Sequence, residues 1–285
     1  MTDSAGLLAR IMERVPPPVE AVNGSGNWTA AERMLGTPLP DDFKQVVETY
    51  GRGDFWDALC LCTPFGDDNP VRLTADLLED FGPLRDSWPE RYPYPLFPEP
   101  GGLLAWAVTD IGTHVCWLTV GPPDSWPVVI WSRDDEYERF DCGVAAFLDG
   151  WLSSRITSEL LHPEPDLAPW FDAAVERDHL YLRLDGGTLP YTERLRILRD
   201  ALGPTADRGS YEHDGKRQDH FVVTEADWHL TYETSYGHQL RVAFPPADSA
   251  QARHAVLTAI DRMGCVVQSI DTVHGTSSWA LCDRE

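Results

Sequence analysis

Basic residues are scarce in this sequence. Its 285 residues include 23 Lys and Arg against 46 Asp and Glu, which gives a formal net charge of −23 at pH 7. Nucleic acids and anionic membranes are bound through Lys/Arg patches that this composition does not supply, so both are poor partners. The charge instead favours a protein partner that has a basic surface.

Long apolar runs and cysteine-rich patterns are also missing. No stretch approaches the roughly 18 consecutive apolar residues that cross a bilayer, and residues 1–15 lack the basic head and apolar core of a signal peptide. The six cysteines are too few and too irregularly spaced for a disulfide framework. We therefore expect a cytoplasmic protein with reduced thiols.

The usual sequence motifs of enzymes and metal sites do not occur. We find no phosphate-binding loop that ends in Lys-Ser/Thr, no GxSxG, no HExxH, no CxxC and no EF-hand loop. Cys60 and Cys62 alternate on one side of a predicted strand, but no second Cys/His pair accompanies them, so we expect them to be small buried side chains. No enzymatic activity, cofactor or metal is expected.

A group of histidines leaves an alternative open. They lie within 26 residues of the C-terminal half, among several Asp and Glu. Their spacings match no compact ligand motif, so we expect polar residues at strand ends or across strands. The alternative is a zinc or acid–base site of a hydrolase on adjacent strands. The group consists of His213, His220, His229 and His238.

Composition changes near residue 165. Residues 1–165 contain 27 acids, 11 bases and eight of the eleven Trp, whereas residues 166–285 contain 19 acids, 12 bases and seven of the nine His. The proline-rich, polar segment around residues 162–166 is typical of a linker. We predict a first domain over residues 1–162, a linker over 163–170 and a second domain over 171–285.

Hydrophobic periodicity predicts an α+β fold for the first domain. Thr29 and Glu32 have the spacing of a helical capping box. Turns of a few residues join three of the apolar strands, which makes them an antiparallel β-meander. Helices bracket this sheet. The predicted helices lie around residues 7–15, 29–35, 40–50, 77–84 and 144–156, and the strands at 58–62, 103–108, 114–120 and 128–131.

The second domain is predicted to be an α/β sandwich. The order of its elements is close to the βαββαβ order of ferredoxin-like sandwiches, with one added strand. That fold hosts many functions and implies none of them. The predicted strands lie at residues 179–184, 220–224, 228–234, 239–244 and 266–273, and the helices at 192–202 and 249–263.

Residues 1–160 carry motifs of a known family. The matching segments are Trp28, Glu32, Leu35-Gly36, Leu39-Pro40-Asp41-Asp42-Phe43, Tyr50-Gly51, Gly53, Pro98-Glu99-Pro100-Gly101-Gly102-Leu103-Leu104-Ala105-Trp106, Trp117-Leu118-Thr119, Trp126-Pro127-Val128-Val129 and Phe147-Leu148-Asp149-Gly150-Trp151. In this order and spacing they resemble the SUKH superfamily. The resemblance implies a SUKH-like sheet flanked by helices and a role in protein binding. Many bacterial members are immunity proteins that neutralise a toxin domain, often a nuclease or a deaminase.

The acidic clusters and loop tryptophans of the first domain are candidate contacts with such a toxin. Carboxylates mimic phosphates in a basic cleft, and opposed charge raises association rates by roughly 10–10³-fold. Tryptophan is frequent at interface hot spots. The alternative is that the acids lie in solvated turns and that each Trp covers an edge of the core. The candidate residues are Asp54, Trp56, Asp57, Asp67, Asp68, Trp126, Asp134, Asp135, Glu136 and Glu138; Trp88 shares this loop context.

The sequence thus predicts an immunity protein that blocks the active site of a basic toxin, most simply one that acts on nucleic acid. The mechanism is steric occlusion with electrostatic complementarity, and no bond is made or broken. The alternative function is an intracellular scaffold or regulator that has no toxin partner. Co-expression separates the two functions, because only an immunity protein rescues growth from a particular toxin.

Overall fold

The protein is built from two compact units. The computed structural model describes residues 4–66, 69–132, 136–163, 166–272 and residue 279. Unit 1 is Met1–Ala174 and unit 2 is Val175–Glu285, and each has its own hydrophobic core. The division falls later than the predicted linker because strand β7 (Phe171–Ala173) pairs with strand β1 (Gly53–Phe55) and so completes the sheet of unit 1.

Unit 1 contains a seven-stranded antiparallel sheet in the order β6-β5-β4-β3-β2-β1-β7. The predicted meander is confirmed, because β3, β4 and β5 pair in sequence. The sequence did not predict the short strands β1, β6 and β7. The remaining strands of this sheet are β2 (Leu59–Leu61), β3 (Leu103–Val108), β4 (His114–Leu118), β5 (Val128–Trp131) and β6 (Tyr137–Phe140).

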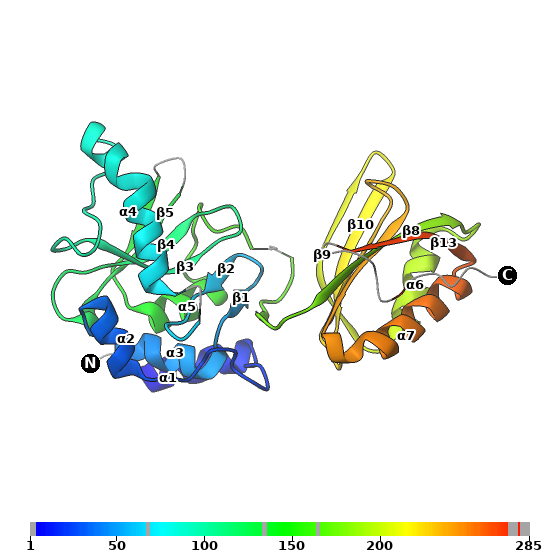
Figure 1. The fold of residues 1–285 in the computed structure, drawn as a ribbon, viewed down its shortest axis with the longest axis horizontal. Helices are drawn as coiled ribbons and strands as arrows, with labels where there is room; N and C mark the ends of the chain where they lie inside the picture. The colour runs from blue at the N-terminus through cyan, green and yellow to red at the C-terminus, as the bar shows by residue number, and fades with distance from the viewer. Residues whose placement is uncertain (1–3, 67–68, 133–135, 164–165, 273–278, 280–285) are drawn as a thin grey trace. The chain divides into compact units, whose positions relative to one another are not determined.

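Helices α1 (Ser4–Arg14), α3 (Asp41–Tyr50) and α5 (Val144–Leu152) pack against one face of this sheet (Figure 1). The helix predicted around residues 40–50 is confirmed as α3, and its Phe43, Val46, Val47 and Tyr50 are all 0% exposed. Gly51 ends α3 with a φ of 68°, and a Cβ atom there would lie only 2.4 Å from the Val22 carbonyl oxygen. Only glycine fits this position.

Helix α2 (Trp28–Leu35) begins differently from the prediction. Its N-cap is Asn27, whose side chain accepts a hydrogen bond from the Ala30 N–H at 3.0 Å. The predicted capping box is therefore wrong. The Glu32 carboxylate instead accepts a hydrogen bond from the Leu39 N–H at 3.0 Å and pairs with the Lys44 ammonium at 2.7 Å, so it joins α2 to α3.

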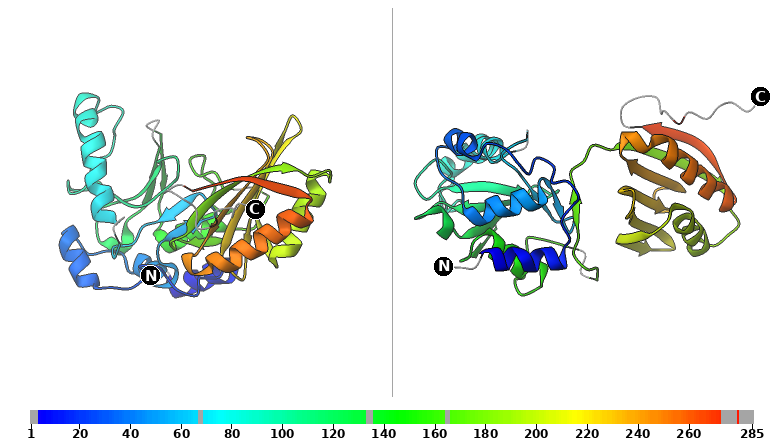
Figure 2. Two further views of the ribbon diagram at one scale, coloured as in Figure 1. Left: turned by 45° about the vertical axis from the view of Figure 1, so that its right-hand side comes forward. Right: turned by 90° about the horizontal axis from the view of Figure 1, so that it is seen from below.

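Helix α4 (Pro70–Ser87) covers the other face of the sheet over β3–β5. Leu77 is 1% exposed, and the Phe81 ring lies 4.4 Å from the Trp131 ring, centroid to centroid. Strand β4 is thus covered on both faces. Figures 1 and 2 show that the far end of α4 extends beyond the sheet.

Unit 2 contains a six-stranded antiparallel sheet in the order β13-β8-β12-β11-β10-β9. Two helices, α6 and α7, lie on the same side of this sheet (Figure 2) and contribute buried side chains to its core. The elements are β8 (Asp178–Gly186), α6 (Tyr191–Leu202), β9 (Thr205–His213), β10 (Lys216–Val223), β11 (Trp228–Glu233), β12 (Gln239–Phe244), α7 (Ser249–Arg262) and β13 (Cys265–Thr272).

The α+β class is confirmed for both units, but the topology of unit 2 differs from the ferredoxin-like order. The sequence missed β9, a polar and largely exposed edge strand without an alternating pattern. In addition, β12 runs antiparallel to β8, whereas a ferredoxin-like sandwich pairs its first and third strands in parallel. Two short 3₁₀ helices, Pro123–Ser125 and Pro246–Asp248, complete the fold. Among the described residues, no helix is both long and apolar enough to cross a membrane.

Candidate partner-binding surface

The structure does not gather the predicted acidic residues on one surface. Glu138 lies on β6, one edge of the sheet, whereas Asp54 lies on β1, next to the opposite edge. The Glu138 carboxylate accepts a hydrogen bond from the Glu159 N–H at 2.8 Å, so it holds the segment after α5. Glu136 is exposed just before β6. Asp67, Asp68, Asp134 and Asp135 lie outside the described residues.

Two of the predicted tryptophan anchors are buried. Trp126 is 3% exposed, and its Nε1–H donates a hydrogen bond to the Gly121 carbonyl at 3.1 Å. Trp56 is 6% exposed and packs 5.7 Å from the Trp151 ring, centroid to centroid. The prediction that they are exposed anchors is wrong, because both turns fold their indole rings back onto the core. Trp88, in contrast, is 49% exposed.

Carboxylates from three segments meet at the β7 end of the sheet. Asp54 stands opposite both Asp172 on β7 and Cys60 on β2. Directly opposed residues of antiparallel strands place their side chains on the same face. Phe55 faces the core, so the alternation of β1 turns Asp54 toward the other face.

The turn between β1 and β2 presents a further carboxylate. Trp56 and Asp57 adopt left-handed φ angles of 58° and 51°, which side chains other than Gly, Asn and Asp rarely do. Such a conformation costs about 1–3 kcal/mol and persists where packing imposes it. Here the Trp56 N–H donates a hydrogen bond to the Trp170 carbonyl at 3.0 Å, and its ring is buried. The anchored Trp56 thereby fixes the position of the exposed Asp57.

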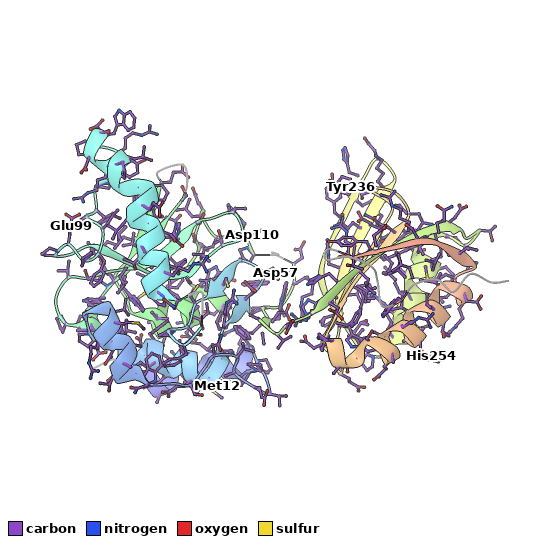
Figure 3. The ribbon with its side chains drawn as sticks, in the orientation of Figure 1. Met12, Asp57, Glu99, Asp110, Tyr236 and His254 are labelled. Atoms are coloured by element: carbon purple, nitrogen blue, oxygen red, sulfur yellow. The ribbon has the colours of Figure 1, made fainter. Side chains whose placement is uncertain are left out.

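The turn between β3 and β4 supplies the last carboxylate. The Thr113 N–H donates to the Thr109 hydroxyl at 3.0 Å, and Gly112 takes a φ of 82°. This closed turn leaves Asp110 and Ile111 exposed at its tip. Figure 3 shows Asp57 and Asp110 next to each other at this end of unit 1.

A small concavity of about 200 Å³ lies between these turns. Asp57 and Asp110 stand at its rim, and buried Ala58 and Leu160 form part of its wall. The remaining lining residues are Thr109, Ile111 and His162. We call Asp54, Asp57, Asp110 and Asp172 together the acidic edge. The concavity combines apolar wall groups with rim carboxylates, a combination that can hold the apolar stem and the charged head of a Lys or Arg side chain.

Like charges repel one another at the acidic edge. Burial raises the pKa of Asp54, and the nearby Asp172 and Asp110 carboxylates raise it further, although the Cys60 thiol donates a hydrogen bond to it and Arg52 opposes the shift. A carboxylate repelled by like charges gains from an added cation. The acidic edge is therefore a place where a positive partner group is favoured.

The cysteines beside the acidic edge are not reactive thiols. A hydrogen bond with Cys62, followed by burial and the Asp54 charge, raises the pKa of Cys60 far above its usual range. Cys62 is 1% exposed. A thiol that stays protonated is a poor nucleophile and a poor metal ligand.

The four predicted histidines do not converge. His220 contacts the Thr231 hydroxyl through Nδ1 at 2.9 Å on the face of the sheet away from the helices. His238 lies on the helix side, where its Nε2 contacts the Tyr232 hydroxyl at 2.9 Å. In the described part of the chain, no group of three His, Cys, Asp or Glu side chains is arranged to hold a metal ion. The strands therefore do not assemble these histidines into the zinc site that the sequence offered as an alternative.

A larger concavity of about 410 Å³ lies next to the turn that contains Trp126. Its charged groups are already paired: Arg139 and Asp141 form an ion pair at 2.7 Å, and the Asp124 carboxylate accepts a hydrogen bond from the Asp41 N–H at 2.8 Å. Hydrogen bonds and an ion pair within the concavity thus already engage these charged groups.

Comparison with known proteins assigns the larger part of unit 1. Residues 25–148 match the family model SUKH_6, described as SMI1-KNR4 cell-wall. Unit 1 therefore contains a SUKH domain. The match confirms the resemblance that the sequence motifs indicated. No curated protein and no solved structure matches the chain.

The SUKH domain contains three of the four acidic-edge residues: Asp54, Asp57 and Asp110. The fourth, Asp172, lies beyond the matched segment and reaches the site only because β7 joins the sheet of the domain. Sequence reasoning identified Asp54 and Asp57 and missed Asp110 and Asp172. Asp110 had a local signal, since it opens the Asp110-Ile111-Gly112 turn, whereas Asp172 had none.

Proposed function

We propose that this protein is an immunity protein whose SUKH domain binds a protein toxin through the acidic edge. SUKH domains are often found in toxin-immunity proteins and are generally non-catalytic, and their partners are proteins. The observation that carries the proposal is the acidic edge itself. Two of its carboxylates, Asp57 and Asp110, stand at the rim of one small concavity, and burial together with the Asp172 and Asp110 charges raises the pKa of Asp54.

The partner is a toxin with a basic active-site cleft, as a nucleic-acid-cleaving domain has. The Asp57 and Asp110 carboxylates take the place of substrate phosphates beside a Lys or Arg side chain of that cleft. The net charge of −23 attracts such a toxin over long range and speeds its capture. Inhibition follows from occlusion of the cleft.

Co-expression tests this function directly. The toxin encoded beside this protein's gene is produced in a host cell with and without the protein, and growth is measured. We expect growth to be rescued from this toxin and not from unrelated toxins. Failure to rescue growth, together with no binding in vitro, would overturn the proposal in favour of a scaffold or regulator.

A charge-matched pair of variants tests the acidic edge. Asp57→Asn with Asp110→Asn removes two charges at the concavity, and Glu13→Gln with Glu20→Gln removes two exposed charges elsewhere in unit 1. We expect the first pair to slow association with the toxin by about tenfold and to flatten its salt dependence. The control pair has a smaller effect. Equal effects of the two pairs would mean that only net charge matters.

The acidic segment Asp134, Asp135 and Glu136, which precedes β6 in the sequence, is a competing candidate for toxin binding. Substitution of all three by Ser removes three charges there. If this variant slows association and the Asp57/Asp110 variant does not, the toxin is bound at the β6 edge instead. The two variants therefore show which of the two acidic segments binds the toxin.

A further inference from the structure

The apolar stripe of α4 continues past the sheet that it covers. Leu73, Leu77 and Phe81 recur every four residues and pack over β3–β5. Leu84 continues this side of the helix, and Trp88 follows as the C-cap residue directly after Ser87. Yet Leu77 is 1% exposed, whereas Leu84 is 36% and Trp88 is 49% exposed. The end of α4 that projects in Figure 1 thus carries apolar side chains that are partly exposed, in contrast to Leu77 over the sheet.

This end of the helix is held in place. Arg85 forms a two-pronged ion pair with Glu99, whose second contact, Nη2 to Oε2, is 3.2 Å. The Trp88 N–H donates to the Leu84 carbonyl at 2.8 Å. The helix continues even though Gly82 and Pro83 lie within it, and these residues cost about 1 and 3 kcal/mol in a helix interior. An exposed indole on an anchored projection is typical of an interaction surface.

Acidic residues surround this projection. Residues 76–99 contain six Asp or Glu and two Arg, and Arg85 is already engaged by Glu99. Asp86 and Glu90 flank Trp88 and are exposed. Their charge opposes contact with an anionic membrane, with nucleic acid or with a second copy of this chain. It favours a protein whose surface is basic around an apolar recess.

We propose that Leu84 and Trp88, here called the α4 tip, insert into an apolar recess on the basic surface of the toxin. This inference rests on the proposed function and adds a second contact to the acidic edge. Buried Trp side chains at the centre of an interface carry much of the binding energy, and the surrounding charges form the rim. The α4 tip slows dissociation of the toxin, whereas the acidic edge speeds its association.

Binding kinetics test the α4 tip. The probe is a catalytically inactive form of the toxin encoded beside the gene, with full-length wild-type protein, Trp88→Ala, Trp88→Phe and Leu84→Ala. The control is Tyr236→Ala, which truncates an aromatic residue of unit 2 that is 79% exposed (Figure 3). We expect Trp88→Ala to raise Kd by about 30-fold. The loss appears as faster dissociation with an unchanged salt dependence. Trp88→Phe retains most of the affinity, and the control variant retains all of it.

The outcomes separate the two proposals. If wild-type protein does not bind the toxin, the proposed function fails and the α4 tip has no partner. If wild-type protein binds and Trp88→Ala changes Kd by less than about twofold, the toxin is bound without the α4 tip. If Trp88→Ala changes the molar mass of the free protein, measured by light scattering, a second copy covers the tip and the proposal is overturned. Unchanged circular dichroism spectra of the variants exclude misfolding as the cause of lost affinity.

Discussion

Asp54 on β1 lies directly opposite Asp172 on β7, so two carboxylates share one face of adjacent strands. Like charges opposed in this way destabilise a sheet. The neighbouring pair in this register is Phe55 with Phe171, whose phenyl rings pack 4.7 Å apart, centroid to centroid, on the other face. Apolar packing therefore fixes a register that holds the two carboxylates together, and unit 1 tolerates the repulsion.

We expect Asp54→Asn to stabilise unit 1 by about 0.2–1 kcal/mol, because it removes the like-charge pair while keeping an acceptor for the Cys60 thiol. The pKa of Asp54 is raised in the folded protein, so the wild type loses stability as pH rises from the ordinary Asp range through the folded pKa. The gain of the variant is therefore full at neutral pH and vanishes in acid.

Urea unfolding followed by tryptophan fluorescence measures this gain, since nine of the eleven Trp belong to unit 1. Glu20→Gln serves as a control, because Glu20 is exposed and neither of its neighbours in the sequence is acidic. A variant less stable than the wild type at pH 7 would show that Asp54 makes a net favourable contact.

We expect Asp149→Asn to destabilise unit 1 by about 1.5–3 kcal/mol, the range for hydrogen bonds to a charged group. Asp149 on α5 is 1% exposed, and Arg10 of α1 donates to it from Nη2 at 2.9 Å. Burial alone would raise the pKa of Asp149, but hydrogen bonds from Arg10 and Arg155 hold it below its ordinary value. This contribution is therefore complete above the ordinary Asp range and is lost as pH falls through the folded pKa.

The same fluorescence-detected unfolding measures this loss. Asp141→Asn is the matched control, since it breaks an ion pair with Arg139 that is exposed on both sides and contributes at most about 1 kcal/mol. Equal effects of Asp149→Asn and Asp141→Asn at pH 7 would contradict the view that burial makes the α1–α5 contact strong.

We expect Arg241→Met to destabilise unit 2 by about 3–5 kcal/mol, because it leaves a buried carboxylate without its cation. Glu233 is 0% exposed and lies 2.7 Å from Arg241 Nη2. Adding Glu233→Gln to Arg241→Met removes the buried charge, so the double variant recovers most of the stability. Far-UV circular dichroism during thermal unfolding measures both variants. No recovery in the double variant would show that Arg241 acts through packing on Tyr181 instead.

The fold could be predicted where apolar spacing decides it. Hydrophobic periodicity predicted the helix around residues 40–50, which is α3, and the short turns between apolar segments predicted the β3–β5 meander. The missed strands β1 and β7 have three residues each, too few for a periodic signal. They form because they pair with neighbouring strands: β7 pairs with β1, and β1 also pairs with β2. The polar edge strand β9 was missed for the same reason, because pairing with its partner strand, and not its own sequence pattern, makes it a strand.

The candidate site was only half predictable. Asp54 and Asp57 are close in sequence and were found as a pair, whereas Asp172 joins them through the pairing of β1 with β7 over more than a hundred residues. No local pattern reports such a contact. Trp56 and Trp126 show the converse error, because a turn position does not determine whether its side chain points outward or back onto the core.

We expect toxin binding to release protons from the acidic edge. A Lys or Arg head placed near Asp54 lowers its raised pKa toward the ordinary range. The complex then binds fewer protons than its free components, so affinity increases as pH rises through the pKa of the free protein. Calorimetric titrations in two buffers with different ionisation enthalpies give the number of protons released. Release is larger at about pH 5 than at neutral pH, and Asp54→Asn removes it while the control Glu20→Gln does not. Identical proton release by wild type and Asp54→Asn would place the toxin's cation away from the acidic edge.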